Sequence, residues 1–411
     1  MRRVVITGVG AVSPVGNTAE ETWSSLIAGK SGIGPITHFD TSDPACKVKL
    51  AAEVKDFDPS LYMEKGDIRK SDLYSQYAMA AAVQAMQDSG LEGNIDSQRL
   101  GVYVGSGIGG MDTFVDQCNT LEQKGMKRIS PFFIPMMISN MAAGNIAIRF
   151  KAKGPSMCVT TACATSAHAI GEAFHTVAHG YADAMIAGGA EATINKLAVA
   201  GFTNCKALTT EEDPNRASIP FDKERSGFVM GEGGAVLVLE EYEHAKARGA
   251  KIYAEIVGYG NTNDAYHMTA PEPNAEGSAK SIELAVQEAG MPADAVLYIN
   301  AHGTSTPLND KTETLAIKKA LGEEAAHKAM VSSTKSMTGH MLGATGALEA
   351  MACAYALRDG VVPPTINYRE PDPECDLDYV PNEARKADIE YAITTNLGFG
   401  GHNACLVLKK I

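Results

Sequence analysis

The feature of this chain that most constrains its fold is a regular alternation between two kinds of segment. Short runs rich in β-branched residues recur along its length, and longer stretches with helical periodicity separate them, such as residues 75–90 and 278–290. Both stretches end in glycine, a residue that commonly closes helices. Strands that alternate with helices predict an α/β fold. The predicted strands are residues 4–10, 99–107, 183–192, 234–241, 254–260, 297–304 and 404–410.

A weak internal repeat suggests that the chain was built by duplication. The segment Ile6–Gly10 is echoed by Ile256–Gly260. The segment Leu237–Leu239, which follows a glycine-rich turn, is echoed by Leu406–Leu408 after a second such turn. Matches this short also arise by chance, so they support duplication as a hypothesis only.

On this hypothesis the two halves meet near residue 250. Residues 1–250 form the N-terminal half and residues 251–411 the C-terminal half. The charged helical segment 240–251 joins them. A chain of 411 residues is also longer than a typical single domain, which favours two units of comparable size.

Composition and charge exclude several classes of protein. The chain is 45% hydrophobic and 21% charged, which is typical of a globular protein with a large core. Its net charge of -13 argues against a nucleic-acid partner, because phosphate binding depends on clustered lysines and arginines. No apolar run approaches about 18 residues, so no membrane insertion is expected. Gly8, Gly10 and Pro14 break the first apolar stretch, which therefore does not resemble a signal peptide, and we expect a cytoplasmic protein.

Two glycine motifs suggest nucleotide binding but lack the required context. Residues 105–110, GSGIGG, fit the dinucleotide fingerprint and follow a predicted strand. About 20 residues further on, however, the polar and basic segment 121–128 stands where a strand ending in an acid should be. A tight turn is therefore the favoured interpretation. Residues 29–31, GKS, resemble the end of a P-loop, but its first glycine would fall on Ser24, so we discard that interpretation.

One of the eight cysteines differs from the others in its surroundings. The cysteines are scattered without Cys-x-x-Cys spacing, which predicts reduced thiols and neither a zinc site nor a disulfide framework. Cys163, however, lies among small residues in VTTACATSAH, at the start of a helix predicted from about Ala164 to Gly180. A helix amino end stabilises an anion and lowers a thiol pKa, so this position favours a nucleophile. The alternative is a small buried cysteine without chemistry.

Two histidine-containing segments strengthen the catalytic interpretation. His302 follows the predicted strand LYIN in NAHGTSTP, and Lys335 and His340 lie in SSTKSMTGH before a helix. Histidines at strand ends and helix starts are well placed for acid–base or electrophilic chemistry, although each alone is more often structural. Together with Cys163 they predict a Cys-His-His site.

The chain resembles the condensing enzymes of the thiolase-like superfamily, and most closely the type II β-ketoacyl-[acyl-carrier-protein] synthases. The segments that carry the resemblance are TTACATSAHAIGEA, INAHGTSTP, SSTKSMTGHMLGATGA and NLGFGGHNACLVL, in this order. It implies two duplicated βαβαβαββ halves in five layers, α-β-α-β-α, and a homodimer. It also implies a decarboxylative Claisen condensation, in which acyl-carrier protein and malonyl-carrier protein give 3-oxoacyl-carrier protein, carbon dioxide and free carrier protein during fatty acid elongation.

The same resemblance implies roles for individual residues. Cys163 would carry the acyl chain as a thioester, with its own backbone N–H and that of Phe399 as the oxyanion hole. His302 and His340 would donate hydrogen bonds to the malonyl thioester, and Lys335 would order the site. The residues implied for substrate binding are Thr304 and Thr306 for the pantetheine arm, Ile108 and Phe202 for the acyl tunnel, and Phe399 as a gate on a glycine hinge.

No cofactor is required on this interpretation, since phosphopantetheine arrives on the carrier protein. An optional monovalent cation would lie near Asn300, Glu349, Thr395 and Asn396. A basic surface would dock the acidic carrier protein, although solvated charges balanced by nearby acids are the alternative. The residues of this surface, here called the basic patch, are Lys65, Arg69 and Lys70 on a predicted helix, Lys124, Lys127 and Arg128, and Lys206.

Departures from the family pattern bear on the alternative functions. Ser226 and His402 stand where many relatives have Asp and Thr. A thiolase would need a second cysteine in a C-x-G motif where this chain has GFGGHN, and a type III synthase would need Asn in place of His340. A non-catalytic chain-length factor would lack Cys163. A polyketide-type ketosynthase stays open, as do the preferred acyl length and the carrier protein.

Overall fold

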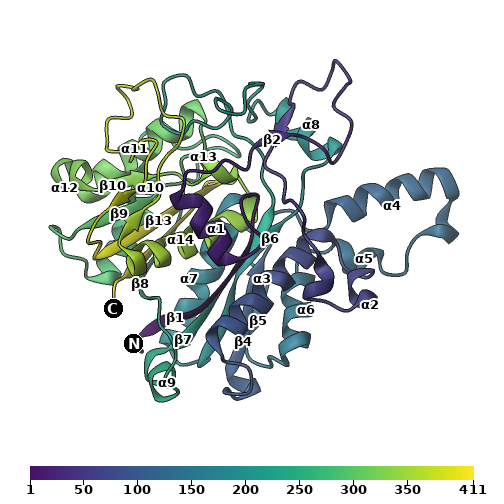
Figure 1. Cartoon of the computed structure of the whole chain (residues 1–411), viewed down its shortest axis with the longest axis horizontal. Helices are drawn as coiled ribbons and strands as arrows, with labels where there is room; N and C mark the ends of the chain where they lie inside the picture. Colours follow the sequence, from purple (N-terminus) through teal and green to yellow (C-terminus); the bar gives the residue numbers. More distant parts are fainter.

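A computed structural model describes all 411 residues of the chain. It is built on one hydrogen-bonded sheet of ten strands in the order β10-β9-β13-β14-β8-β1-β7-β6-β4-β5 (Figure 1). The strands before residue 250 are β1 (Val4–Val12), β4 (Leu100–Gly105), β5 (Ser156–Met157), β6 (Ala184–Glu191) and β7 (Gly233–Glu241). Those after it are β8 (Ala254–Asn263), β9 (Leu297–Asn300), β10 (Met330–Ser332), β13 (Tyr391–Gly398) and β14 (His402–Lys409).

The helices of the chain vary from single turns to 17 residues. They are α1 (Ala19–Ile27), α2 (Lys65–Ile68), α3 (Leu73–Ser89), α4 (Met111–Lys124), α5 (Phe133–Met137), α6 (Met141–Phe150), α7 (Thr165–Ala178), α8 (Lys196–Asn204), α9 (Tyr242–Ala247), α10 (Glu276–Ala289), α11 (Pro307–Leu321), α12 (Glu323–Lys328), α13 (Lys335–Thr338) and α14 (Thr345–Asp359). Short 3-10 turns are η1 (Pro59–Leu61), η2 (Ser97–Arg99), η3 (Met126–Arg128), η4 (Ala162–Ala164) and η5 (Leu342–Ala344), and two-residue strands form the small pairs β2 (Gly34–Pro35) with β3 (Leu50–Ala51) and β11 (Val361–Val362) with β12 (Arg385–Lys386).

The order of the ten strands is symmetric about its centre. Read outward from β1 it runs β7, β6, β4, β5, and read outward from β8 it runs β14, β13, β9, β10. The chain order in each group is β-α-β-α-β-α-β-β, with α3, α6 and α7 in the first and α10, α11 and α14 in the second. The two first strands meet antiparallel, with Val4 opposite Ile256 and Ile6 opposite Ala254. The first pair of echoed segments therefore lies on the adjacent strands β1 and β8, and the second pair lies on the equivalent strands β7 and β14 of the two groups.

The layers follow from which helices contact which strands. Helices α7 and α14 contact each other and lie between the two strand groups, while α3 and α6 cover the outer face of the first and α10 that of the second, with α11 against α10. Only the ends of β1 and β8 pair, so the groups diverge and enclose the two central helices. This confirms the predicted thiolase-like α-β-α-β-α arrangement, although hydrogen bonds join both groups into one sheet.

Hydrophobic burial explains why these layers are stable. The largest cluster holds 49 buried residues around α7, α14 and the inner faces of the strands. Clusters of 24 and 20 buried residues fill the outer layers, under α3 and under α10 with α11. Helix α14 is buried over nearly its whole length, in keeping with its central layer. No helix combines the length and the apolar character that crossing a bilayer requires.

Candidate active site

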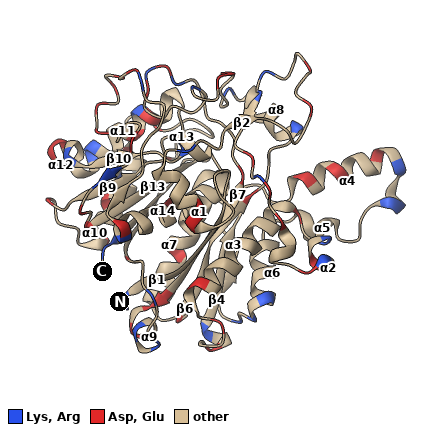
Figure 2. Cartoon of the chain, in the orientation of Figure 1, with Lys and Arg blue, Asp and Glu red and all other residues tan.

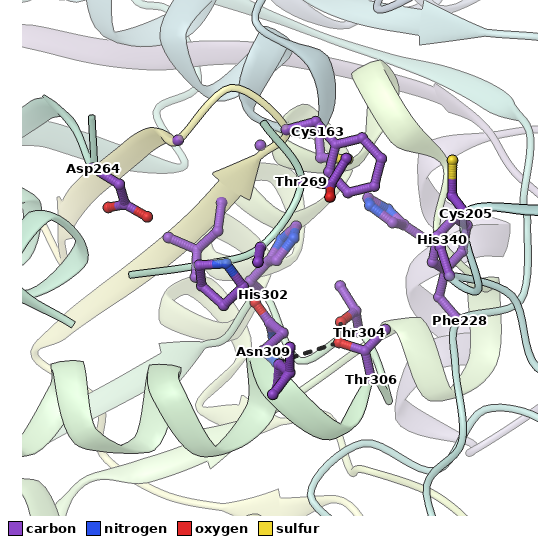
Figure 3. Close-up of a pocket in the computed structure, with 18 of the residues that line it drawn as sticks. Cys163, Cys205, Phe228, Asp264, Thr269, His302, Thr304, Thr306, Asn309 and His340 are labelled. Carbon is purple, nitrogen blue, oxygen red and sulfur yellow. Dashed lines mark hydrogen bonds between the residues drawn. The ribbon is translucent and has the colours of Figure 1, made fainter. Parts of the chain in front are cut away.

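One cavity of about 350 Å³ collects eight of the residues singled out in the sequence, including the cysteine and both histidines of the predicted catalytic set. Cys163, His302 and His340 all line it, although they come from η4, the loop after β9 and the turn before η5 (Figure 3). In this view Cys163 lies above the two imidazoles. The other predicted residues in its wall are Phe202, Lys206, Thr304, Thr306 and Phe399.

Cys163 occupies a tight turn at the amino end of central helix α7. Ala162 before it has a left-handed φ of +51°, which turns the chain sharply into the helix. The backbone of Gly398 passes so close that a Cβ there would lie 2.5 Å from the Thr161 carbonyl oxygen and 3.3 Å from the Cys163 nitrogen. The backbone N–H groups of Phe399 and of Cys163 itself are directed at the sulfur and lower its pKa. These are the two N–H groups expected to form the oxyanion hole.

The expectation of a low thiol pKa at Cys163 is wrong for the resting site. Burial raises the pKa of the Cys163 thiol to about 12, and the charge of Lys335 and the two backbone N–H groups only partly oppose this effect. The helix amino end does stabilise an anion, but desolvation of the sulfur outweighs it. The thiol is therefore protonated at rest.

His302 is held through its backbone. Its N–H and that of Gly303 each donate to the buried Glu313 carboxylate at 2.7 Å, and the Thr395 hydroxyl donates to the same group at 2.6 Å. Burial holds the pKa of His302 well below its usual value, and the charge of Lys335 adds to the effect. His302 is therefore a neutral imidazole at physiological pH.

His340 faces His302 across the cavity wall. The two ring centroids lie 5.2 Å apart, with the rings nearly perpendicular at 87°. His340 Nδ1 lies 3.1 Å from the Thr345 hydroxyl, whereas its Nε2 is buried without a partner. Burial, aided by the charge of Lys335, holds the pKa of His340 well below its usual value. A second neutral imidazole thus keeps one nitrogen free toward the cavity.

Lys335 is near the histidines but does not line the cavity. Its Nζ donates to Glu349 Oε1 at 2.5 Å, and both side chains are only 1% exposed. Asn396 donates to Glu349 Oε2 at 2.6 Å. Burial raises the pKa of Glu349 to about 7, although Lys335 opposes this shift. The structure therefore places Lys335 as a buried charge behind the site.

The region predicted for a cation contains unpaired polar atoms. Both side-chain polar atoms of Asn300 and the Oδ1 of Asn396 are buried without hydrogen-bond partners. Asn300 lies beside Thr394 in the register of β9 and β13, next to Thr395 and Asn396. Amide oxygens are suitable ligands for a hard cation, so this donor set fits one. No group of three or more His, Cys, Asp or Glu side chains could hold a metal ion.

A row of rings connects the predicted gate with the histidines. The ring centroids of Phe399 and Phe202 lie 6.3 Å apart, and those of Phe202 and Phe228 lie 5.6 Å apart. The ring centroids of Phe228 and His340 lie 5.2 Å apart. Gly400 and Gly401 have positive φ values of +89° and +76°, so the segment after Phe399 depends on glycine. The imidazole of His402, one of the departures from the family pattern, lies 3.1 Å from where a Gly400 Cβ would be.

The GSGIGG segment forms a tight turn whose amides are already occupied. The buried Glu191 carboxylate accepts hydrogen bonds from the Ser106 hydroxyl and the Gly107 and Ile108 amides. These amides are not free to bind a phosphate. Ile108 itself is 41% exposed and lies outside the cavity, so its role in an acyl tunnel stays a prediction.

The residues of the basic patch are exposed but do not share a helix as predicted. Helix α2 spans only Lys65–Ile68, because Arg69 ends it, and Lys70 lies beyond it with its ammonium over the Phe132 ring. Figure 2 shows basic residues at α2, at the far end of α4 and near α8, on the same side of the view. Only Lys206 reaches the cavity wall.

Several residues of the site do not belong to the motifs that indicated it in the sequence. Glu191 accepts the Gly107 amide from a distant segment, and Glu313 accepts the amide of His302, which lies 11 residues before it. His168 lies buried on α7 between the Thr161 hydroxyl and the Asn403 carbonyl oxygen, and burial lowers its pKa to about 4. The sequence signal for His168 is its place in VTTACATSAH, five residues after Cys163. The cavity also includes Asp264, Thr269, Asn309 and Asn403.

Comparison with known proteins gives full-length matches. Residues 1–245 match the model of the β-ketoacyl synthase N-terminal domain, and residues 253–369 match that of the C-terminal domain. The 3-oxoacyl-[acyl-carrier-protein] synthase 2 of Synechocystis sp. is 52% identical over 411 residues, which cover 100% of this chain and 98% of the relative.

Solved structures with the same fold include two that contain ketosynthases. The ishigamide ketosynthase/chain length factor has a TM-score of 0.93 and 38% identity, over 100% of this chain and 99% of the other. A ketosynthase bound to its hexaketide, in complex with its type II polyketide acyl-carrier protein, gives a TM-score of 0.87 and 36% identity with the same coverage. Because the two domain models match most of the chain and the identity to the relative extends over the full length, the chain belongs to the β-ketoacyl synthase family.

Proposed function

We propose that the chain is an acyltransferase that elongates fatty acids by decarboxylative Claisen condensation. Acyl-[acyl-carrier-protein] and malonyl-[acyl-carrier-protein] react to give 3-oxoacyl-[acyl-carrier-protein], carbon dioxide and free carrier protein. The observation that carries the proposal is the meeting of Cys163, His302 and His340 in one cavity. The 52% identity to a 3-oxoacyl-[acyl-carrier-protein] synthase 2 supports fatty acid elongation as the pathway.

In the first half-reaction Cys163 takes the acyl chain. Its sulfur attacks the thioester carbonyl, the bond from that carbon to the pantetheine sulfur breaks, and the thiol proton leaves with the pantetheine sulfur. The N–H groups of Cys163 and Phe399 stabilise the oxyanion of the tetrahedral intermediate. Because the resting thiol is protonated, proton loss accompanies the attack.

In the second half-reaction the histidines act on the malonyl thioester. With the Thr345 hydroxyl donating to Nδ1, His340 carries its proton on the unpartnered Nε2. His340 and His302 then donate hydrogen bonds to the thioester oxygen, where negative charge develops as carbon dioxide leaves. The enolate carbon attacks the Cys163 thioester, a carbon–carbon bond forms, and the cysteine sulfur departs. Neutral imidazoles suit this role because they donate without protonating the enolate.

Lys335 and the cation region are assigned positioning roles. Burial keeps both imidazoles neutral, and the buried charge of Lys335, held by Glu349, adds to this effect. An optional monovalent cation would be held by Asn300 and Asn396 beside Glu349, with Thr395 nearby, and would supply positive charge to order the ends of β9 and β13. No other cofactor is required.

The remaining cavity residues would bind the substrate arms. The hydroxyls of Thr304 and Thr306 lie 2.9 Å apart at the cavity wall and suit the amides of a pantetheine arm (Figure 3). Phe202 and Phe399 would bound the acyl chain near the thiol, and Ile108 would limit its length further in. The carrier protein would dock on the basic patch, of which Lys206 borders the cavity.

We also infer a homodimer, formed around the segment between β4 and β5. Helix α4 extends away from the body of the chain (Figure 1). Exposed apolar side chains gather on this segment. A group of exposed apolar side chains of this size is unusual on a surface that contacts only solvent. They are Ile108, Phe114, Leu121, Met126, Phe132, Ile134 and Ile148, together with Met157 of the adjoining β5. All eight cysteines are free thiols, which fits the cytoplasm.

A polyketide-type ketosynthase is the second candidate, favoured by the structural likeness to the ketosynthase in complex with its type II polyketide acyl-carrier protein. A non-catalytic chain-length factor is disfavoured by the presence of Cys163.

The test is mass spectrometry of the intact protein after incubation with fatty acyl and polyketide carrier proteins. We expect a mass increase of one acyl group on Cys163 from fatty acyl carriers. Loading from polyketide carriers alone, or no loading, would contradict the proposal.

A further inference from the structure

A buried carboxylate lies where the turn after β4 meets the turn after His340. Glu191, the last residue of β6, is completely buried. Its Oε1 accepts hydrogen bonds from the Ser106 hydroxyl at 2.9 Å and the Ile108 amide at 3.2 Å. Its Oε2 accepts them from the Gly107 amide at 2.8 Å and the Gly343 amide at 3.1 Å. All four partners are neutral donors, so the carboxylate is a hub for two loops.

These loops pack against each other with their backbones. A Cβ on Gly343 would lie 2.5 Å from the Gly107 nitrogen and 2.8 Å from Glu191 Oε2. The Thr160 hydroxyl donates to the Ser106 carbonyl oxygen at 3.1 Å, which ties the same turn to the segment before Cys163. Glu191 therefore connects three parts of the site that are far apart in the sequence.

The four hydrogen bonds that Glu191 accepts depend on its negative charge. An ionised carboxylate is an acceptor only and has room for all four donors. A neutral carboxyl or an amide adds its own donor, and the Ser106 hydroxyl is the one partner that can also accept. If Oε2 keeps the two glycine amides, the Ile108 amide, whose hydrogen bond is the longest, loses its acceptor. Loss of the charge thus loosens the turn at Ile108.

The charge of Glu191 is itself sensitive to pH near neutrality. Burial raises its pKa to about 7, although the hydrogen bonds from Ser106, Gly343, Gly107 and Ile108 oppose the shift. The titratable groups coupled to it are the Cys163 thiol on η4 and the Tyr74 phenol on α3, both neutral at this pH. The carboxylate is therefore charged above about pH 7 and neutral below it.

We propose that Glu191 is a positioning residue that sets acyl-chain selectivity by fixing the Ile108 turn relative to Cys163 and His340. This inference rests on the proposed function, in which long acyl chains must displace Ile108. With Glu191 ionised, displacement of Ile108 is opposed by the hydrogen bond to its amide. With Glu191 neutral, the side chain moves aside more easily, and long chains gain relative to short ones.

The test compares condensation rates for carrier proteins with acyl chains of about four and sixteen carbons. Glu191→Gln should raise the ratio of long-chain to short-chain kcat/KM by about tenfold, the factor expected when one hydrogen bond to a charged group is lost. The matched control is Glu240→Gln. Glu240 is equally buried and bonded to Thr7, His244 and Arg248, away from the cavity, so its variant should leave the ratio unchanged.

A second arm needs no variant. In the unaltered protein the same ratio should rise as the pH falls from about 8 to about 6, because Glu191 becomes neutral, and it should be flat in Glu191→Gln. A purely structural role would change the rates for both chains together. A ratio that is independent of pH in the unaltered protein, or an equal change in both variants, would overturn the inference. If the unaltered protein showed no condensation at any chain length, that result would instead contradict the proposed function.

Discussion

The two strand groups present the same turn at the same place but with different chemistry. In the first, η4 and α7 carry Ala162-Cys163-Ala164-Thr165, and in the second, η5 and α14 carry Leu342-Gly343-Ala344-Thr345. The first residue of each turn is left-handed, with φ of +51° and +48°. Cys163 therefore has Gly343 as its counterpart.

This difference shows how a duplicated scaffold becomes an asymmetric site. The first group supplies the thiol, while the second supplies His302 and His340 from its own loops. At Cys163 the side chain projects into the cavity, whereas at Gly343 the space for a side chain is filled by Gly107 and Glu191. Of the two equivalent turns, only the first therefore contributes a side chain to the cavity.

Removing the thiol tests the contribution of the first strand group and should have the largest effect on activity. Cys163→Ala should lower condensation at least about a thousandfold, since the covalent step is lost while the turn remains intact. Intact-protein mass spectrometry should find no acyl group, and the circular dichroism spectrum should be unchanged. Cys205→Ala, which removes the other cysteine of the cavity wall, is the control and should still be acylated. Acylation of the Cys163 variant at the native rate would refute this assignment.

Removing either imidazole tests the contribution of the second group. His302→Ala and His340→Ala should still accept the acyl chain but should decarboxylate malonyl thioester about 10²- to 10³-fold more slowly, because each loses one donor to the enolate oxygen. Loading is followed by mass spectrometry and decarboxylation by release of labelled carbon dioxide. His327→Ala, on exposed α12, is the control. Native decarboxylation in the His340 variant would show that the division between the groups is wrong.

Adding a methyl group at the counterpart of Cys163 tests the packing. Gly343→Ala should destabilise the fold by about 1 to 3 kcal/mol, because the new Cβ would meet backbone and carboxylate atoms at 2.5 and 2.8 Å. The free energy of urea unfolding measures the effect. Gly201→Ala, where nothing lies within 4 Å of the new Cβ, should not lower stability. Equal stability of both variants would contradict the packing argument.

A substitution in the turn after β4 tests whether the first strand group limits the length of the acyl chain. Ile108→Phe should retain condensation of short acyl chains and lose most activity on medium and long ones, because overpacking costs about 1 to 3 kcal/mol. Each methylene that a longer tunnel buries contributes roughly 0.8 kcal/mol, so the loss should grow with chain length. Rates for carriers of about four to sixteen carbons measure this. A uniform decrease at every length would mean that Ile108 only packs the turn.

The smallest expected effect concerns the basic patch. Replacing Lys65, Arg69 and Lys127 by Glu should raise the apparent KM for carrier-bound substrate roughly three- to tenfold and leave pantetheine-bound substrate nearly unchanged. The control replaces three exposed lysines that follow residue 250, Lys280, Lys328 and Lys410. Equal changes for both substrates, or an equal effect of the control, would count against docking there.

Most of the fold could be predicted because it depends on local pattern. The helix predicted over 75–90 is α3, that over 278–290 is α10, and the strand predicted over 99–107 contains β4. The candidate site was found because its motifs are short and contiguous around Cys163, His302 and His340. The helix predicted to hold Lys65, Arg69 and Lys70 was wrong, since a run of charges says little about where a helix ends.

What the sequence determined by itself is therefore the set of elements and the chemistry available to them. Alternating periods specify strands and helices, and small residues around a cysteine indicate an approach by other atoms. Only the tertiary structure decided the protonation of that cysteine, because desolvation depends on the segments that bury it, and it raises the thiol pKa to about 12 against the effect of the helix amino end. The role of Glu191 was decided in the same way, since its four donors come from turns before Gly109 and after His340 that meet only in the folded chain.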